Sequence, residues 1–298
     1  MIKYLQSGPV TVILAFVLWG ITPLFYSYLS GGSLIHIFVY RVLFSIPLLL
    51  AIRFFIHKKT FFRDLLKDKK SFVFCIIAGL LMITSWLSFI YALTNHRVLM
   101  ASLGYFINPL FVILLGSIIL KEKISLCQII AIFSGVCGLI FQLFSTNNIP
   151  VLALIMGGAF ALYGLARKFI YYDAITSVTL ETFLALPVAL FILIYMNQSM
   201  SPPSDIPCIL YIMTAPVTII PLVLFAVALN HTSLIVTGLA QYIEPSIQFL
   251  TAVVILGETV NHVELFCFSA VWFGLLLCII ESFYRNYRQH NHHENTIR

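Results

Sequence analysis

The chain has 298 residues, of which 61% are hydrophobic and only 9% are charged. An average soluble domain is about 25% charged, so this chain has too little polar surface to cover a soluble globule, and we predict an integral membrane protein. The composition excludes secreted, nucleic-acid-binding and ordinary cytosolic proteins.

Ten apolar stretches follow one another along the chain, separated by turn-forming or charged residues. Each is about as long as the 20 residues that a helix needs to cross a ~30 Å hydrocarbon core. They are too long and too apolar for barrel strands. We therefore predict an all-α integral membrane fold with ten transmembrane helices, at residues 9–29, 33–56, 71–93, 99–120, 124–144, 149–169, 175–196, 206–229, 234–256 and 263–284.

The positions of the basic residues predict the orientation of these helices. With the N-terminus inside the cell, 15 of the 17 Lys and Arg residues lie on the inner side, Arg97 lies outside, and Arg41 lies within a span. Cytoplasmic loops of membrane proteins carry an excess of Lys and Arg. We therefore expect both termini to be cytoplasmic, including a basic, His-rich tail at 285–298. The net charge of +6 needs no nucleic-acid partner to explain it.

The chain also contains an internal repeat. A shift of 136 residues maps Asn108-Pro109 onto Glu244-Pro245 and Glu122 onto Glu258, and a shift of 140 maps Arg41 onto Glu181. We predict two five-helix halves, at 1–146 and 147–284, which must have opposite orientations in the membrane because five is odd. Inverted repeats of this kind are typical of secondary transporters, whose binding site lies near the bilayer midplane.

Charged residues inside the predicted spans are the first candidates for a transport site. Arg41, Glu181 and Glu244 lie mid-span, where a charge costs about 2.5–3.5 kcal/mol on insertion scales. We expect them to bind a charged or zwitterionic substrate or, for the glutamates, to carry a proton. The alternatives are an internal salt bridge, or snorkelling of Arg41 towards an interface.

Neutral polar and aromatic residues complete the candidate site. Those near the two repeated prolines are expected at the substrate or proton site: Tyr105, Asn108, Gln241 and Tyr242. Others are expected to line the cavity: Trp19, Trp86, Ser88, Tyr91, Asn95, Tyr163 and Gln248. The alternative for both groups is interhelical hydrogen bonding or aromatic packing, which is common in membrane bundles.

Motifs for other chemistries are missing from the sequence. There is no Walker A loop and no HExxH, GxSxG or GxGxxG pattern, so ATP hydrolysis and nucleophilic catalysis have no support. None of the six cysteines forms a CxxC pair. We therefore expect no catalytic residues, no metal and no cofactor.

Six segments carry a family resemblance: Tyr40-Arg41, Leu99 to Leu110, Leu120 to Glu122, Leu162 to Leu165, Glu181-Thr182 and Gln241 to Leu250. They resemble the RarD group of the EamA family, in the drug/metabolite transporter superfamily. The resemblance implies two inverted five-helix repeats around a central cavity, in a permease of the bacterial inner membrane. RarD proteins are named for chloramphenicol sensitivity or resistance. Where the family has glycine-glutamate after the fourth span, this sequence has Lys121-Glu122, which questions a glycine-dependent turn there.

These observations predict a secondary, ATP-independent transporter of a small metabolite or drug that works by alternating access. Its expected partners are a small-molecule substrate, the lipid bilayer and, on the proton hypothesis, protons. A channel or lipid scramblase is the first alternative, and an integral membrane enzyme is the second. Small residues spaced four apart suit packing within a monomer or in a homodimer: Ser134, Gly138, Ala270 and Gly274.

Overall fold

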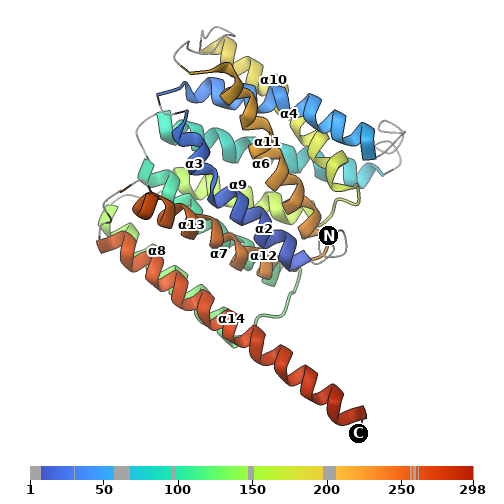
Figure 1. Ribbon diagram of the computed structural model, residues 1–298, viewed down its shortest axis with the longest axis vertical. Helices are drawn as coiled ribbons and strands as arrows, with labels where there is room; N and C mark the ends of the chain where they lie inside the picture. The colour runs from blue at the N-terminus through green and yellow to red at the C-terminus, as the bar shows by residue number, and fades with distance from the viewer. Residues whose placement is uncertain are drawn as a thin grey trace.

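The structure is a computed structural model that describes residues 8–29, 31–56, 68–94, 98–146, 151–196, 206–255, 257, 260 and 262–297. These residues form helices and turns, with no β-strand among them. The helices are α2 (Gly8–Gly20), α3 (Thr22–Ser27), α4 (Leu34–Ile56), α6 (Lys69–Thr94), α7 (Val98–Ile118), α8 (Leu126–Thr146), α9 (Val151–Arg167), α10 (Ala174–Tyr195), α11 (Cys208–Leu229), α12 (Leu234–Gln241), α13 (Ile243–Leu250), the π-helix η1 (Thr251–Ile255) and α14 (His262–Ile297). The predicted all-α class is confirmed, and each predicted apolar stretch contains helix (Figure 1).

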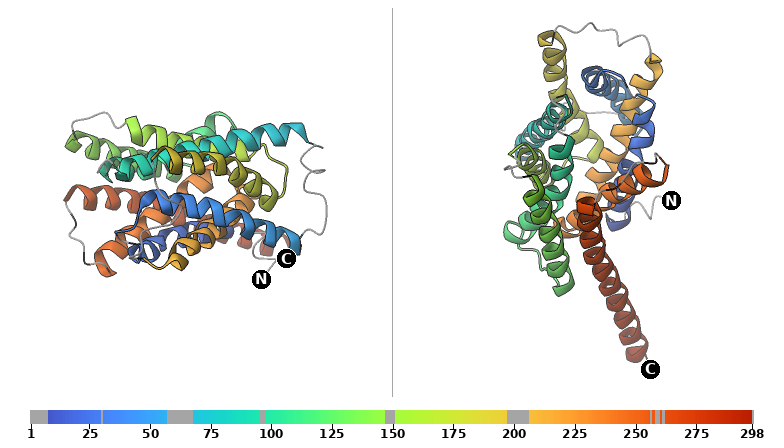
Figure 2. Two further views of the ribbon diagram at one scale, coloured as in Figure 1. Left: turned by 90° about the horizontal axis from the view of Figure 1, so that it is seen from above. Right: turned by 90° about the vertical axis from the view of Figure 1, so that its left-hand side faces the viewer.

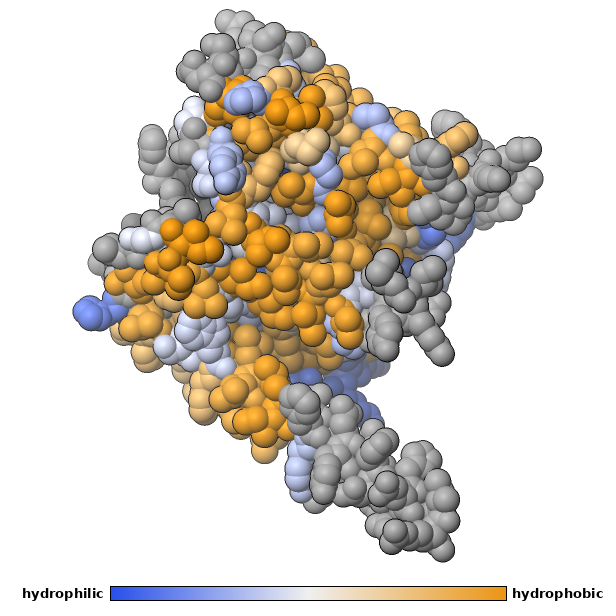
Figure 3. Space-filling view, viewed as in Figure 1, coloured by the Kyte–Doolittle hydropathy of each residue, from blue (hydrophilic) through white to orange (hydrophobic). Residues whose placement is uncertain are grey.

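Several helices have the length and composition of membrane spans. Within the described residues, five stretches meet both criteria: Gly8–Ser27, Leu34–Phe54, Lys69–Phe89, Ala174–Tyr195 and Cys208–Leu229. Large apolar side chains also face outwards, among them Ile194, which is 75% exposed, and Val254, which is 76% exposed. Figure 3 shows apolar residues spread across the middle of one face. A soluble monomer rarely exposes so large an apolar surface, so these features indicate a multi-pass membrane protein.

Two of the predicted spans are broken near prolines. The first ends as α2 at Gly20 and resumes as α3, with Pro23 in its first turn. The ninth is divided at Tyr242 into α12 and α13, three residues before Pro245, and its last turn is η1. Proline lacks the N–H for a helical hydrogen bond and clashes with the preceding turn, which explains both breaks. The equivalent Pro109 lies inside a continuous α7, so the two repeated prolines differ in local backbone shape.

Helices of the first half pack mainly on helices of the second half. The main contacts pair α6 and α7 with α9, α11 with α2 and α4, α10 with α4 and α6, α12 with α7, α13 with α2, and α14 with α8. In the predicted repeat, α2, α4, α6, α7 and α8 correspond to α9, α10, α11, α12–α13 and α14. If each helix is replaced by its predicted counterpart, this set of pairs is reproduced; for example, α6–α9 becomes α11–α2. Figure 2 shows two layers, one made of α6 to α10 and the other of α2, α4 and α11 to α14.

The last helix, α14, packs along α8 through small residues. A Cβ atom added at Gly274 would lie 2.6 Å from the Ala131 Cα, and one added at Gly138 would lie 3.4 Å from the Cys267 Cα. The two backbones therefore approach closely, and these small residues serve packing within the chain. α14 continues to Ile297 and projects beyond the other helices, so the segment predicted as a tail is helical here (Figure 1).

The turn after α7 has the left-handed backbone that the family's glycine would favour. Lys121 has a φ of +53°, and Gly257, its equivalent after the ninth span, has a φ of +70°. Lysine thus forms the turn despite the strain that a side chain brings to this region. The Glu122 carboxylate accepts hydrogen bonds from the backbone N–H groups of Leu234 (2.7 Å) and Ile235 (2.8 Å). It therefore caps α12 and joins it to the end of α7.

Candidate functional site

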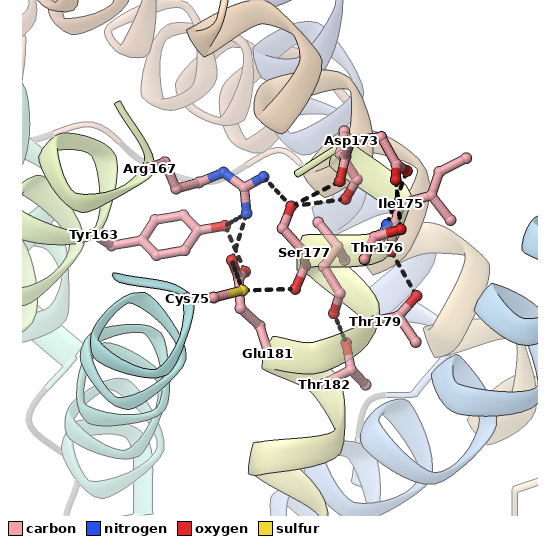
Figure 4. A network of polar contacts seen from close by, with 12 residues as sticks. Cys75, Tyr163, Arg167, Asp173, Ile175, Thr176, Ser177, Thr179, Glu181 and Thr182 are labelled. Atoms are coloured by element: carbon pink, nitrogen blue, oxygen red, sulfur yellow. Dashed lines mark hydrogen bonds and ion pairs between the residues drawn. The ribbon is translucent and has the colours of Figure 1, made fainter. Parts of the chain in front are cut away.

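A buried ion pair forms the centre of a polar network between α9 and α10 (Figure 4). The Arg167 Nη1 lies 2.6 Å from the Glu181 Oε1, and the two side chains are 3% and 4% exposed. Arg167 also donates to the Tyr163 hydroxyl at 3.2 Å and to the Ser177 Oγ at 2.8 Å. The Tyr163 hydroxyl in turn donates to the Glu181 Oε2 at 3.1 Å. Both carboxylate oxygens therefore have protein partners.

Helix α6 closes this network from the first half of the chain. The Cys75 thiol lies 3.4 Å from the Ser177 carbonyl oxygen and 3.8 Å from the Glu181 Oε1. One turn later, a Cβ atom added at Gly79 would lie 3.4 Å from the Glu181 Cα, so α6 and α10 are in close contact. Removing one partner of a buried ion pair leaves an uncompensated charge and is strongly destabilising. The network therefore suits the positioning of α6, α9 and α10 better than the capture of a cargo.

Sequence reasoning singled out Glu181 and Tyr163 but missed Arg167. It counted Arg167 among the charges of the inner side, because the positive-inside pattern accounts for a basic residue at a helix end without any partner. The structure gives Glu181 the internal salt bridge that was the alternative to a substrate role, with Arg167 as its partner. The available signal was the spacing of Tyr163 and Arg167, four residues apart on one face of α9.

Arg41, which the predicted repeat matches with Glu181, lies on α4 against aromatic rings. Its guanidinium carbon is 4.2 Å from the centroid of the Trp86 ring and 5.3 Å from that of Phe38. A cation over an aromatic face is stabilised by about 2 kcal/mol when the pair is desolvated. Trp86, a predicted cavity residue, thus positions the guanidinium of Arg41.

A second polar group lies where α7 and α12 pack together. A Cβ atom added at Gly238 of α12 would lie 3.1 Å from the Pro109 carbonyl oxygen of α7. Asn108 precedes this proline, and its Oδ1 is buried without a hydrogen-bond partner in the described part of the chain. Gln241 ends α12 and is 4% exposed, and neither its Oε1 nor its Nε2 has a partner there. Buried polar groups are nearly always hydrogen-bonded, so these two carboxamides have unused bonding capacity.

Tyr242, at the break of the ninth span, and Glu244, just after it, have different neighbours. Glu244 lies in the first turn of α13, and its Oε1 accepts a hydrogen bond from the Gln248 Nε2 at 3.2 Å. A carboxylate in a first helical turn is favoured by the helix dipole. Tyr242 is 3% exposed and packs against Cys267 and Val271 of α14. Glu244 thus has its partner on its own helix, whereas Tyr242 packs against α14.

The remaining predicted residues are more scattered. Trp19 packs in an aromatic cluster with three phenylalanine rings, at centroid distances of 5.5, 5.7 and 6.3 Å. Ser88 is buried, whereas Tyr91, near the end of α6, is 51% exposed. Asn95 lies outside the described residues, as does the side chain of Tyr105. A cavity-lining or binding role for these residues stays a prediction.

Polar contacts also join the two halves at the end of the molecule where α4 ends and α10 begins. Arg53 lies 4.0 Å from the Asp173 Oδ2, and the Tyr172 hydroxyl donates to the Asp68 carbonyl oxygen at 2.7 Å. The Ser71 Oγ accepts a hydrogen bond from the Tyr171 N–H at 2.8 Å. Asp68 caps the start of α6, because its Oδ1 accepts hydrogen bonds from the Lys70 and Ser71 N–H groups, each at 3.1 Å. Hydrogen bonds from Ser71 lower the pKa of the Asp68 carboxyl. These contacts would have to separate if the two halves opened at this end.

Metal centres and grooves are the other places where a ligand could bind. No group of three or more His, Cys, Asp or Glu side chains comes together among the residues that the structure describes. An open groove of about 280 Å³ lies between α13 and α14 and is mostly apolar. Its Ser246 hydroxyl donates to the Tyr242 carbonyl oxygen at 2.6 Å and accepts from the Trp272 Nε1 at 2.8 Å. The groove therefore suits an apolar chain better than a polar cargo.

Comparisons with known proteins find similar transporters over nearly the whole chain. The profile of the EamA-like transporter family matches residues 6–144 and 148–280. The protein RarD of Escherichia coli (strain K12) is 31% identical over 290 residues, which cover 96% of this chain and 98% of that protein. An uncharacterized transporter of Bacillus subtilis (strain 168), YojE, is 31% identical over 277 residues, or 91% and 93% of the two chains. One solved crystal structure superposes with a TM-score of 0.70 at 13% identity, over 91% of this chain and 97% of that one, and supports the fold alone.

Proposed function

The chain belongs to the EamA-like transporter family, and from this premise we propose that it is a secondary, ATP-independent transporter of a small metabolite or drug in the bacterial inner membrane. It works by alternating access, so that one central site opens to each side of the membrane in turn. The observation that carries the proposal is the double match of the family profile, once in each half of the chain. A relative in Pseudomonas aeruginosa, 26% identical over 204 residues, is named chloramphenicol-sensitive protein RarD, which makes chloramphenicol a cargo to test.

The inverted repeat is part of this proposal. The helix contacts support it, because exchanging the two halves reproduces the same set of packed pairs. With ten spans and both termini in the cytoplasm, the repeats are 1–146 and 147–284. An interface between two such halves allows the site to open on either side when the halves exchange their shapes.

The proposed orientation can be tested with a native cysteine. Cys208 is exposed at the start of α11, on the side that we propose is external. A membrane-impermeant maleimide added to right-side-out membrane vesicles should label it, and Cys208→Ser should remove that label. Cys127, near the start of α8 on the proposed inner side, serves as the control and should react only after the membrane is permeabilised. Labelling of Cys208 only after permeabilisation would contradict the orientation.

We place the cargo site at the crossing of α7 with the broken span, around Asn108, Gln241 and Glu244. A role of Arg41, which lies on α4 against Trp86, in binding cargo stays a prediction. Glu244 is proposed to carry the coupling proton, because a membrane-embedded carboxylate is costly without a use. Glu181 has a role in positioning the helices around the site, since Arg167 already neutralises it.

The experiment is gradient-driven flux in proteoliposomes. Purified protein is reconstituted and offered amino acids, nucleosides and chloramphenicol, with and without an imposed pH gradient. We expect a saturable cargo whose flux depends on the gradient, and Glu244→Gln should lose that dependence. Glu281→Gln is the matched control, because its carboxylate accepts from the Ser125 hydroxyl at the contact of α8 and α14. Gradient dependence that persists in folded Glu244→Gln would remove the proton role from this residue.

Measurements on the same reconstituted vesicles separate the rival functions. A channel would give flux that does not saturate, and a scramblase would move labelled lipid in vesicles without cargo. An integral membrane enzyme would return a chemically altered compound.

A further inference from the structure

The register of α7 against α12 brings two carboxamides to one place. The helices are antiparallel, since Cβ atoms added at Gly116 and Gly238 would lie 3.1 Å from the Leu234 Cβ and 3.1 Å from the Pro109 carbonyl oxygen, respectively. Asn108 directly precedes Pro109, whose carbonyl faces Gly238, and Gln241 lies one turn after Gly238 towards the end of α12. The two residues therefore lie within about one helical turn of each other along the packed pair.

Both turns are also places where proline leaves the backbone incompletely bonded. In an α-helix each N–H group donates to the carbonyl four residues earlier, but proline has no N–H group. The carbonyls of Tyr105 and Gln241 therefore receive no such hydrogen bond from Pro109 and Pro245. The break at Tyr242 separates α12 from α13 at this point. Discontinuous helices with freed backbone groups are where membrane transporters bind their cargo.

Glu244, the charged residue next to this crossing, already has a hydrogen-bond partner, whereas the Gln241 amide and the Asn108 Oδ1 have none in the described part of the chain. The Glu244 Oε1 accepts a hydrogen bond from the Gln248 Nε2 at 3.2 Å. The Gln241 amide is buried, at 4% exposure, and it leaves both a donor and an acceptor unused. The Asn108 Oδ1 adds a second unused acceptor. What the site lacks is thus a neutral group that both donates and accepts.

From this pattern we propose that Gln241 and Asn108 recognise a neutral amide-type edge of the cargo, meaning a donor beside an acceptor as in a carboxamide, lactam or urea. The inference rests on the proposed transport function and names the cargo class for its central site. Gln241 can pair with such an edge through its Nε2 and Oε1 at once, and the Asn108 Oδ1 accepts a further N–H from the cargo. A carboxylate cargo offers no donor to the two acceptors, and an ammonium cargo offers no acceptor to the Gln241 amide.

The first test uses three compounds with one ring and three polar groups: benzamide, benzoate and benzylamine. Each is added to the purified protein in detergent, and the unfolding temperature is recorded. We expect benzamide to raise it at concentrations about tenfold or more below those at which benzoate or benzylamine acts, because an unmatched buried polar group is costly. The response to benzamide should be lost in Gln241→Met, which keeps the length of the side chain.

Thr237→Val is the matched control for the variant. Thr237 lies one turn before Gln241, is fully buried, and donates locally to the Ser233 carbonyl oxygen at 2.9 Å. This variant should keep the response to benzamide. A response to benzoate or benzylamine in preference to benzamide, no response to benzamide, or an unchanged response in Gln241→Met would each overturn the proposed class.

Two further readouts keep this inference separable from the transport proposal. Without any added compound, Gln241→Met should unfold at the same temperature as the natural protein or higher, because it removes two unpartnered polar atoms. A lower unfolding temperature than that of Thr237→Val would mean that the amide is bonded in the free protein, against the inference. In proteoliposomes, saturable flux of charged cargoes alone would keep the transporter and overturn the amide class. Binding of benzamide without flux of any compound would keep the amide class and overturn the transport proposal.

Discussion

Replacing Arg167 by Met should destabilise the protein more than any other single loss of charge described above. The side chain is 3% exposed, and it makes a 2.6 Å ion pair with Glu181 and hydrogen bonds to Tyr163 and Ser177. Its removal leaves a carboxylate buried among apolar groups with only neutral partners. Breaking a buried pair in this way costs about 3–5 kcal/mol. At about 2 °C per kcal/mol for a chain of this size, the unfolding temperature should fall by roughly 6–10 °C.

The assay is a double-mutant cycle with Arg167→Met, Glu181→Leu and the combined variant, followed by unfolding in detergent micelles. The combined variant removes both charges, so it should be less destabilised than the sum of the two single changes, with a coupling of about 2–3 kcal/mol. It should also keep saturable transport, because the pair positions helices and does not bind cargo. A coupling below about 0.5 kcal/mol, the error of additivity between independent sites, would refute the idea of a structural pair.

The other predictions concern single turns and hydrogen bonds, each measured as an unfolding temperature. Lys121→Gly should stabilise the protein by up to about 1 kcal/mol, because glycine adopts the positive φ of this position without strain. Gly257→Ala should destabilise it by about as much, because its side chain would have space but would strain a backbone with positive φ. A change of stability in the same direction for both variants would contradict this prediction. Glu122→Ala should cost about 1–2 kcal/mol, since it frees two N–H groups at the start of α12, and Glu122→Gln should cost less because one acceptor remains; a loss of equal size in both would show that the charge alone matters. Tyr163→Phe should cost about 1–2 kcal/mol through the lost bond to Glu181, and an unchanged stability would place that hydroxyl outside the network.

Much of the helical architecture could be predicted, because the signals for each helix lie within its own stretch of sequence. Apolar runs of span length produced helices at all ten predicted places. Short-range signals explain some of their starts: Asp173 accepts from the Thr176 N–H at 3.0 Å and Ser233 from the Val236 N–H at 3.1 Å, the N-cap contacts that such residues favour. Local rules work here because the interacting groups are three residues apart.

The candidate site was harder to predict, because its contacts join distant segments. Glu181 stands out as a mid-span charge, but nothing local indicates that its partner is Arg167 at a helix end. A repeat offset paired Glu181 with Arg41 instead, and the structure places Arg41 over the Trp86 ring. The proline positions were visible in the sequence, yet only one of the two repeated prolines breaks its helix, because the surrounding packing decides how the freed turn relaxes.

Counterflow is the measurement that tests the central claim most directly. Proteoliposomes with the natural protein are preloaded with a candidate cargo, diluted, and given a trace of the labelled compound outside. A carrier with one site that opens alternately to each side should accumulate the label transiently above equilibrium, and the overshoot should saturate with cargo concentration. We expect this overshoot for at least one compound with an amide-type edge. Label that only equilibrates, at a rate proportional to its concentration, would contradict alternating access and favour a channel.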